Sequence, residues 1–110
     1  MTTGTTTIVL TDKGFDEALM AHPQLVVDFW APWCGPCRVL SPVLDEVARE
    51  QAGRAVVGKV NVDEQPALAG RFGVRSIPTL IFFKGGEAVD TVVGVVPKAE
   101  IVKRIEALQD

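Results

Sequence analysis

A short apolar run that ends at a closely spaced pair of cysteines restricts the possible folds of this chain more than any other feature. The run covers residues 25–30, and the only two cysteines, Cys34 and Cys37, follow it closely. Beyond them, apolar residues recur at helical spacing over residues 39–51. The cysteine pair is therefore predicted to lie where a buried strand passes into the N-terminus of a helix.

This position favours redox chemistry at the two cysteines. A helix N-terminus presents unpaired N–H groups and the positive end of the peptide dipoles, which favour a thiolate over a thiol at Cys34. The thiolate is the form that attacks a disulfide. Cys37 follows about one helical turn later and within bridging reach. Pro36 suits the first turn of a helix, and Gly35 leaves room for another polypeptide to approach.

Two other kinds of site contain a Cys-x-x-Cys pair. A structural disulfide across so small a loop would constrain the unfolded chain little and add little stability. A structural zinc ion needs four ligands, and this chain offers two thiols and one histidine, His22. A metal shared between two chains stays open, although nothing in the sequence favours it. His22 precedes a proline and is expected in a solvated turn, so we predict no metal site and no role for His22 as a general base.

Two charged residues interrupt apolar segments. Asp28 lies inside the run before the cysteines, where loss of solvation raises the pKa of a carboxyl group. The alternative is an acid that reaches water at the strand end, but its place six residues before Cys34 favours a functional carboxyl group. Lys59 interrupts the apolar stretch 55–62 and taken alone would be an ordinary surface lysine.

Length and charge narrow the class of protein. The 110 residues are expected to form one domain, 1–110, with nearly half of the residues apolar. The net charge of −3 disfavours binding to nucleic acid or to an anionic membrane. No run approaches the roughly 20 apolar residues that span a bilayer. The first five residues show no export-signal pattern, so a cytoplasmic location is expected.

The remaining pattern predicts an α/β fold with the element order β-α-β-α-β-α-β-β-α. Strands are expected at residues 6–10, 25–30, 55–62, 79–83 and 87–94. Helices are expected after a cap at Thr11 or Asp12, over 39–51, between Asp63 and Gly73, and from Pro97 as the first helical residue. Because residues 84–87 form a hairpin turn, the last two strands are antiparallel and the sheet is mixed, with helices on both faces.

Three segments resemble the thioredoxin family. They are DFWAPWCGPC at residues 28–37, KVNVD at 59–63 and SIPTL at 76–80, and they occur in the family's order. The resemblance extends over residues 8–108, which is far more specific than a lone Cys-x-x-Cys. It implies the thioredoxin fold.

The resemblance also implies roles for further residues. Asp28 would transfer protons to and from Cys37 through water, and Lys59 would lie beside it and lower its pKa. The Ile77–Pro78 bond would be cis and lie next to the cysteines, although a proline is also compatible with the first position of an ordinary strand. The backbone there would bind an extended substrate segment. The docking surface would comprise Trp33, Gly35, Pro36, Ile77, Pro78, Gly94 and Val95.

The predicted function is that of a thiol–disulfide oxidoreductase acting as a general protein disulfide reductase. Cys34 is the nucleophile and Cys37 the resolving cysteine. The resemblance implies recharging by a thioredoxin reductase that draws on NADPH, with disulfide-containing client proteins as partners, no bound cofactor and a monomeric chain. One alternative is an oxidase or isomerase of the same fold, although such relatives usually carry a histidine in place of Pro36. The other is a binding module that acts independently of redox state.

Overall fold

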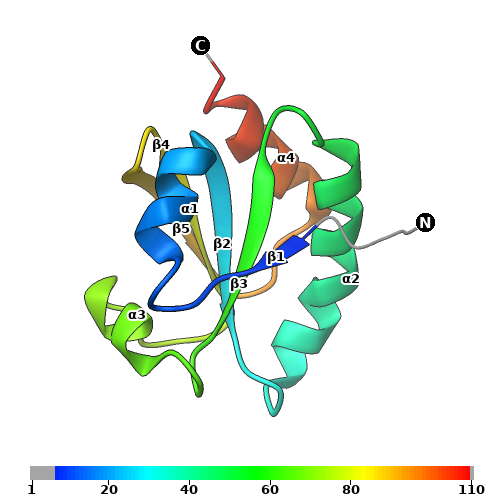
Figure 1. Cartoon of the computed structure of the whole chain (residues 1–110). Helices are drawn as coiled ribbons and strands as arrows, with labels where there is room; N and C mark the ends of the chain where they lie inside the picture. The colour runs from blue at the N-terminus through cyan, green and yellow to red at the C-terminus, as the bar shows by residue number, and fades with distance from the viewer. Residues whose placement is uncertain (1–6, 110) are drawn as a thin grey trace, which may run out of the picture.

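The computed structural model describes residues 7–109, which form a five-stranded sheet with helices on both faces (Figure 1). The order of the strands in the sheet is β1-β3-β2-β4-β5. The elements, in chain order, are β1 (Thr7–Val9), α1 (Phe15–Ala21), β2 (Gln24–Trp30), α2 (Gly35–Glu50), β3 (Val56–Asn61), α3 (Pro66–Arg71), β4 (Thr79–Lys84), β5 (Glu87–Val93) and α4 (Lys98–Glu106). This element order confirms the one predicted from the sequence.

The sheet is mixed, as expected from the predicted hairpin turn at residues 84–87. Strands β1, β3 and β2 are parallel to one another, β4 is antiparallel to β2, and β5 is antiparallel to β4. Gly85 and Gly86 form the β4–β5 turn with φ of 58° and 87°, a left-handed conformation that glycine adopts without steric cost. Of the first predicted strand, residue 6 lies outside the described residues, as do residues 1–5.

The strands bury side chains on both faces of the sheet because alternate residues of a strand point to opposite sides. On one face, α2 and α4 pack on Val26 of β2, Val57 of β3 and Phe82 of β4. On the other face, α1 and α3 pack on a second cluster that includes Leu25, Val27 and Phe29 of β2. Asp28 shares its face with Val26 and is therefore directed toward α2.

The ends of some helices differ from the prediction. Helix α2 begins at Gly35 with Cys34 as its N-cap, which confirms a helix N-terminus at the cysteine pair and Pro36 in the first turn, although the apolar pattern alone extended back only to residue 39. Neither Thr11 nor Asp12 is the N-cap of α1; the N-cap is Gly14, which has no side chain to cap the helix. Pro97 is the N-cap of α4 and not its first helical residue. Helix ends depend on a few backbone hydrogen bonds, which the apolar periodicity does not report.

Candidate active site

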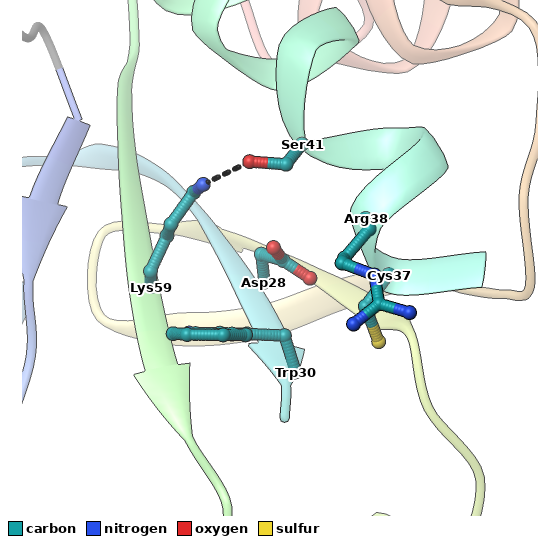
Figure 2. A pocket seen from close by; sticks show the side chains of 6 residues that line it. All are labelled: Asp28, Trp30, Cys37, Arg38, Ser41 and Lys59. Atoms are coloured by element: carbon teal, nitrogen blue, oxygen red, sulfur yellow. Dashed lines mark hydrogen bonds between the residues drawn. The ribbon is translucent and has the colours of Figure 1, made fainter. Parts of the chain in front are cut away.

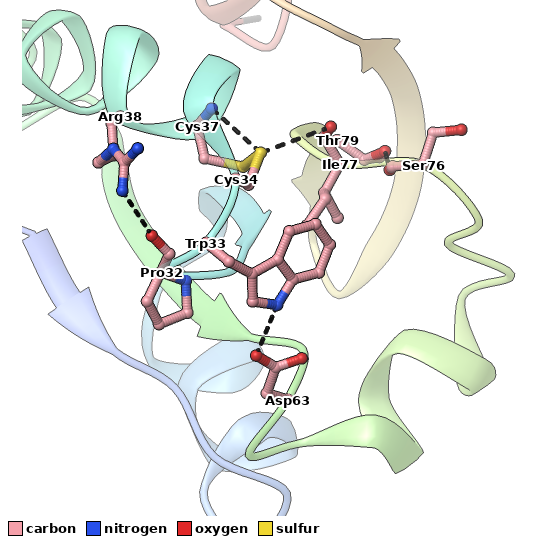
Figure 3. The surroundings of a disulfide bond; sticks show 9 residues. All are labelled: Pro32, Trp33, Cys34, Cys37, Arg38, Asp63, Ser76, Ile77 and Thr79. Carbon is pink, nitrogen blue, oxygen red and sulfur yellow. Dashed lines mark hydrogen bonds between the residues drawn. A yellow bond between two sulfur atoms is a disulfide. The ribbon is translucent and has the colours of Figure 1, made fainter.

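The two cysteines form a disulfide at the N-terminus of α2, with their Cα atoms 5.2 Å apart (Figure 3). Both are almost fully buried, with exposed fractions of 4% for Cys34 and 2% for Cys37. They form a small apolar cluster with Ala31, and Val62 and Ile77 pack against it. The predicted position of the pair, between the central strand and the following helix, is confirmed.

Backbone groups surround the sulfur of Cys34. As the N-cap of α2, its Sγ accepts a hydrogen bond from the backbone N–H of Cys37, with an N···S distance of 3.2 Å. In general, an N–H group and a helix dipole placed in this way favour a thiolate over a thiol. The carbonyl oxygen of Ile77 lies 3.8 Å from the Cys34 sulfur. Cys34 therefore lies at the N-terminus of the helix, whereas Cys37 lies inside its first turn.

Asp28 lines a cavity of about 100 Å³ together with Cys37, and Figure 2 shows both side chains there. The carboxyl group is 2% exposed, and its Oδ1 has no hydrogen-bond partner among the described residues. Burial raises the pKa of Asp28 from 3.8 to about 7, although the positive charge of Lys59 lowers it. The predicted rise in the pKa is therefore confirmed, and the group can exchange a proton near neutral pH.

Lys59 lies directly opposite Asp28 in the parallel β2–β3 register. Its Nζ donates a hydrogen bond to Ser41 Oγ at 2.8 Å (Figure 2). The same Nζ lies 3.9 Å from Asp45 Oδ1. Both partners belong to α2, and the sequence analysis assigned neither of them to the site. The available signal was their spacing, because Ser41 follows Cys37 by one helical turn and Asp45 follows Ser41 by another.

The residues predicted for the docking surface are mostly exposed around the disulfide. Trp33 is 67% exposed, Val95 is 47% exposed, and Gly35 and Pro36 are also exposed. The indole N–H of Trp33 donates to Asp63 Oδ2 at 2.9 Å, which orients the ring beside the disulfide (Figure 3).

The loop before β4 completes this region. The Ile77–Pro78 bond is cis, as the resemblance implied. Ile77 and Gly94 are half-buried, and the Gly94 N–H donates to the Pro78 carbonyl at 2.8 Å. Pro78 itself is buried, so its side chain contributes less surface than expected. A hydrogen bond already occupies the Pro78 carbonyl, whereas the Ile77 carbonyl faces the Cys34 sulfur.

A shallow cavity of about 400 Å³ extends from Trp33 toward α3. The sequence analysis did not predict most of its lining, because the contributing residues come from separate segments of the chain. The lining residues are Trp33, Val62, Pro66, Ala69, Gly70, Val74, Arg75 and Ile77. This cavity widens the apolar surface on one side of the cysteine pair.

His22 lies outside this site, between α1 and β2, at the end of β2 opposite to the cysteines. Its backbone N–H caps α1 by donating to the Ala18 carbonyl. Within residues 7–109, no group of three or more His, Cys, Asp or Glu side chains is arranged to hold a metal ion. No helix in that part of the chain is long and apolar enough to cross a membrane.

Comparisons with known proteins agree on one family. A family model described as thioredoxin matches residues 6–107. The chain is 52% identical over 98 residues to thioredoxin 1 of a Nostoc species, with 88% of this chain and 92% of that protein covered. It is 48% identical to a chloroplastic M-type thioredoxin of Pisum sativum and spans 58% of that longer protein. A solved mutant thioredoxin from Halobacterium salinarum matches 99% of the chain with a TM-score of 0.89 and 34% identity.

Proposed function

The chain belongs to the thioredoxin family and is a thiol–disulfide oxidoreductase, and from this premise we propose that it is a general protein disulfide reductase. The observation that carries the proposal is the pairing of two unlike cysteines. Cys34 caps a helix and accepts an N–H hydrogen bond, whereas Cys37 lines the cavity of a carboxyl group whose pKa is about 7. One sulfur is suited to attack and the other to proton-coupled resolution.

The reaction has two exchange steps. The Cys34 thiolate attacks one sulfur of a client disulfide, forms a mixed disulfide and releases the other client sulfur as a thiolate, which takes up a proton. Cys37 then gives its proton to the Asp28 carboxylate and attacks Cys34. The Cys34–Cys37 disulfide forms, the bond from Cys34 to the client breaks, and the client leaves fully reduced. The dithiol loses two electrons and the client disulfide gains them.

Asp28 is proposed to act as the general base for Cys37, and Lys59 to keep this carboxyl group ionisable. A base with a pKa near the working pH combines a useful fraction of the charged form with adequate basicity. The cavity beside Asp28 has room for water, since one water molecule needs only about 10–15 Å³ of such volume. A water molecule there would relay the proton between Cys37 and Asp28.

Client proteins would dock around the cysteine pair on the exposed Trp33, Gly35, Pro36 and Val95. The half-buried Ile77 and Gly94 and the buried Pro78 would form the floor of this surface. This surface carries no formal charge, and exposed apolar patches of this kind commonly mark partner sites. An extended client segment could pair with the backbone near Ile77, which favours contact with many sequences. Broad client choice follows, because backbone pairing does not depend on the client's side chains.

Regeneration of the dithiol needs an external electron donor. We assign this role to a thioredoxin reductase that draws on NADPH, with no cofactor held by this chain and the chain acting as a monomer. The reducing direction of the reaction suits a compartment with a reducing thiol pool, so we propose a cytoplasmic location.

The equilibrium reduction potential of the Cys34–Cys37 pair tests the proposal. Titration against a glutathione or dithiothreitol buffer should give a value near −270 mV, the potential of thioredoxin itself. A value of about −120 to −180 mV would instead identify an oxidase or isomerase on the same fold. A variant with both cysteines replaced by serine should lose all client reduction. Retention of full biological activity by that variant would identify a redox-independent binding module.

A further inference from the structure

Ser41 lines the cavity at the proposed proton-transfer site, and its hydroxyl bonds to Lys59 and not to a cysteine. It lies one turn after Cys37 on α2 and lines the same cavity as Asp28. Its Oγ accepts a hydrogen bond of 2.8 Å from Lys59 Nζ (Figure 2). Ser41 therefore connects the helix that carries Cys37 to the strand that carries Lys59.

Lys59 needs such a partner to stay near Asp28. A lysine side chain is long and flexible, and its ammonium group has three donors. The side chain is only 19% exposed, and its ammonium group lies 3.9 Å from Asp45, whose side chain is 43% exposed. Without the Ser41 hydroxyl, the ammonium group would lose a hydrogen bond that ties it to the lining of the cavity. The more exposed Asp45 and water would then compete for the ammonium group.

We propose that Ser41 is a positioning residue, whose hydroxyl holds the Lys59 ammonium group at the wall of the Asp28 cavity and thereby assists proton transfer from Cys37. This role rests on the proposed function, since it concerns the resolving step of disulfide reduction. Ser41 does not touch the reacting sulfur atoms and acts only through Lys59. The hydroxyl is uncharged, so it adds no charge to the cavity. It acts only by fixing the position of the Lys59 ammonium group.

Among the charged groups around Asp28, Lys59 is the one whose position can change the pKa of the carboxyl group. From α2, Arg38 also lines the cavity, but its Nη1 is held by the Pro32 carbonyl at 3.0 Å. Asp45, also from α2, has its Oδ1 3.9 Å from the Lys59 ammonium group. Burial raises the pKa of Asp28, and the charge of Lys59 is the force that lowers it. A displaced ammonium group therefore leaves the carboxyl group harder to ionise.

A carboxyl titration of the oxidised protein tests this role directly. In the disulfide form Cys37 does not titrate, so the observed midpoint belongs to Asp28 alone. Carbon NMR of the Asp28 carboxyl group should show a midpoint raised by about 0.5 to 1 pH unit in Ser41→Ala, since a neighbouring opposite charge shifts a pKa by about 1 to 3 units. Ser41→Thr keeps the hydroxyl and should retain the wild-type midpoint.

A Lys59→Met background supplies the decisive control. If Ser41 acts through Lys59, Ser41→Ala should leave the Asp28 midpoint of the Lys59→Met protein unchanged. An equal rise in both backgrounds, or an unchanged or lowered midpoint in Ser41→Ala alone, would overturn the proposal. Because the titration follows one residue of the folded protein, a general loss of stability would not produce the expected pattern.

The effect on resolution is measured separately. Stopped-flow mixing of the reduced protein with an aromatic disulfide releases one thiolate when Cys34 attacks and a second when Cys37 resolves the adduct. Ser41→Ala should move only the pH profile of the second release to higher pH, and an unmoved profile would refute the assistance to Cys37. If the wild-type chain fails to reduce protein disulfides, the proposed function fails, while the carboxyl titration still decides whether Ser41 positions Lys59.

Discussion

Replacement of Asp28 by asparagine should make the protein more stable, and the gain should depend on pH. Asparagine has nearly the same shape as aspartic acid but cannot ionise. The wild-type carboxyl group is 2% exposed, and its Oδ1 has no hydrogen-bond partner within residues 7–109. Compared with a carboxyl group in water, such a group needs additional free energy to ionise in the folded protein. In the unfolded chain the group is solvated and needs almost no additional free energy.

The magnitude follows from the two pKa values of Asp28. The folded value of about 7 exceeds the ordinary value of 3.8, so the folded state binds more protons between these pH values. The stability of the wild-type protein therefore falls as the pH rises from about 4 to 7, and the loss is complete above 7. A difference of about three pH units corresponds to roughly 4 kcal/mol. Asp28→Asn should escape this loss.

Urea unfolding of the oxidised proteins at pH 4, 6 and 8 measures the effect by linear extrapolation. The unfolding free energy of Asp28→Asn, relative to wild type, should increase by roughly 4 kcal/mol between pH 4 and pH 8. Any cost of burying the amide is the same at each pH and cancels in this comparison. Glu87→Gln, an exposed carboxyl-to-amide change at the start of β5, should show little such increase. A difference that stays constant across this pH range would refute the reasoning about Asp28.

Three further substitutions test other parts of the structure. Cys37→Ser should accumulate a mixed disulfide between Cys34 and a client, visible by mass spectrometry; absence of the adduct would contradict the assigned order of attack. Lys59→Met should raise the pKa of Asp28 above 7 in an NMR titration, since it removes the charge that lowers the pKa, and a fall would contradict this. Gly58→Ala should lower the free energy of urea unfolding by about 1–3 kcal/mol, because the added Cβ would overlap the buried Leu10 side chain. A loss below about 0.5 kcal/mol would show that Leu10 moves aside.

The sequence predicted the fold well because its main signals are local. An apolar run on both faces indicated the central strand β2, and the turn at Gly85 and Gly86 indicated the antiparallel β4–β5 pair. Helix ends were predicted less well. The cap of α1 at Gly14 and the start of α4 after Pro97 depend on a few backbone hydrogen bonds near each end. Such bonds leave little trace in apolar periodicity.

The candidate site shows a similar division. The cysteines and Asp28 were identified from their places along the chain, whereas Lys59 gained a role only through the family resemblance. Ser41 and Asp45 were not assigned to the site. Their contacts with Lys59 join α2 to β3, and no sequence spacing reports how closely two separate elements approach.

Local physics therefore accounts for the reactivity that we propose for Cys34. Cys34 follows the central strand and precedes a helix, and any chain with that order exposes its thiol to the N–H groups and dipole of the helix start. The proton chemistry of Asp28 has a different origin. Its raised pKa depends on desolvation by the surrounding elements and on a charge held from β3, and both arise only when distant segments pack together. Desolvation is set by all neighbouring atoms in space, so it emerges only from the folded chain.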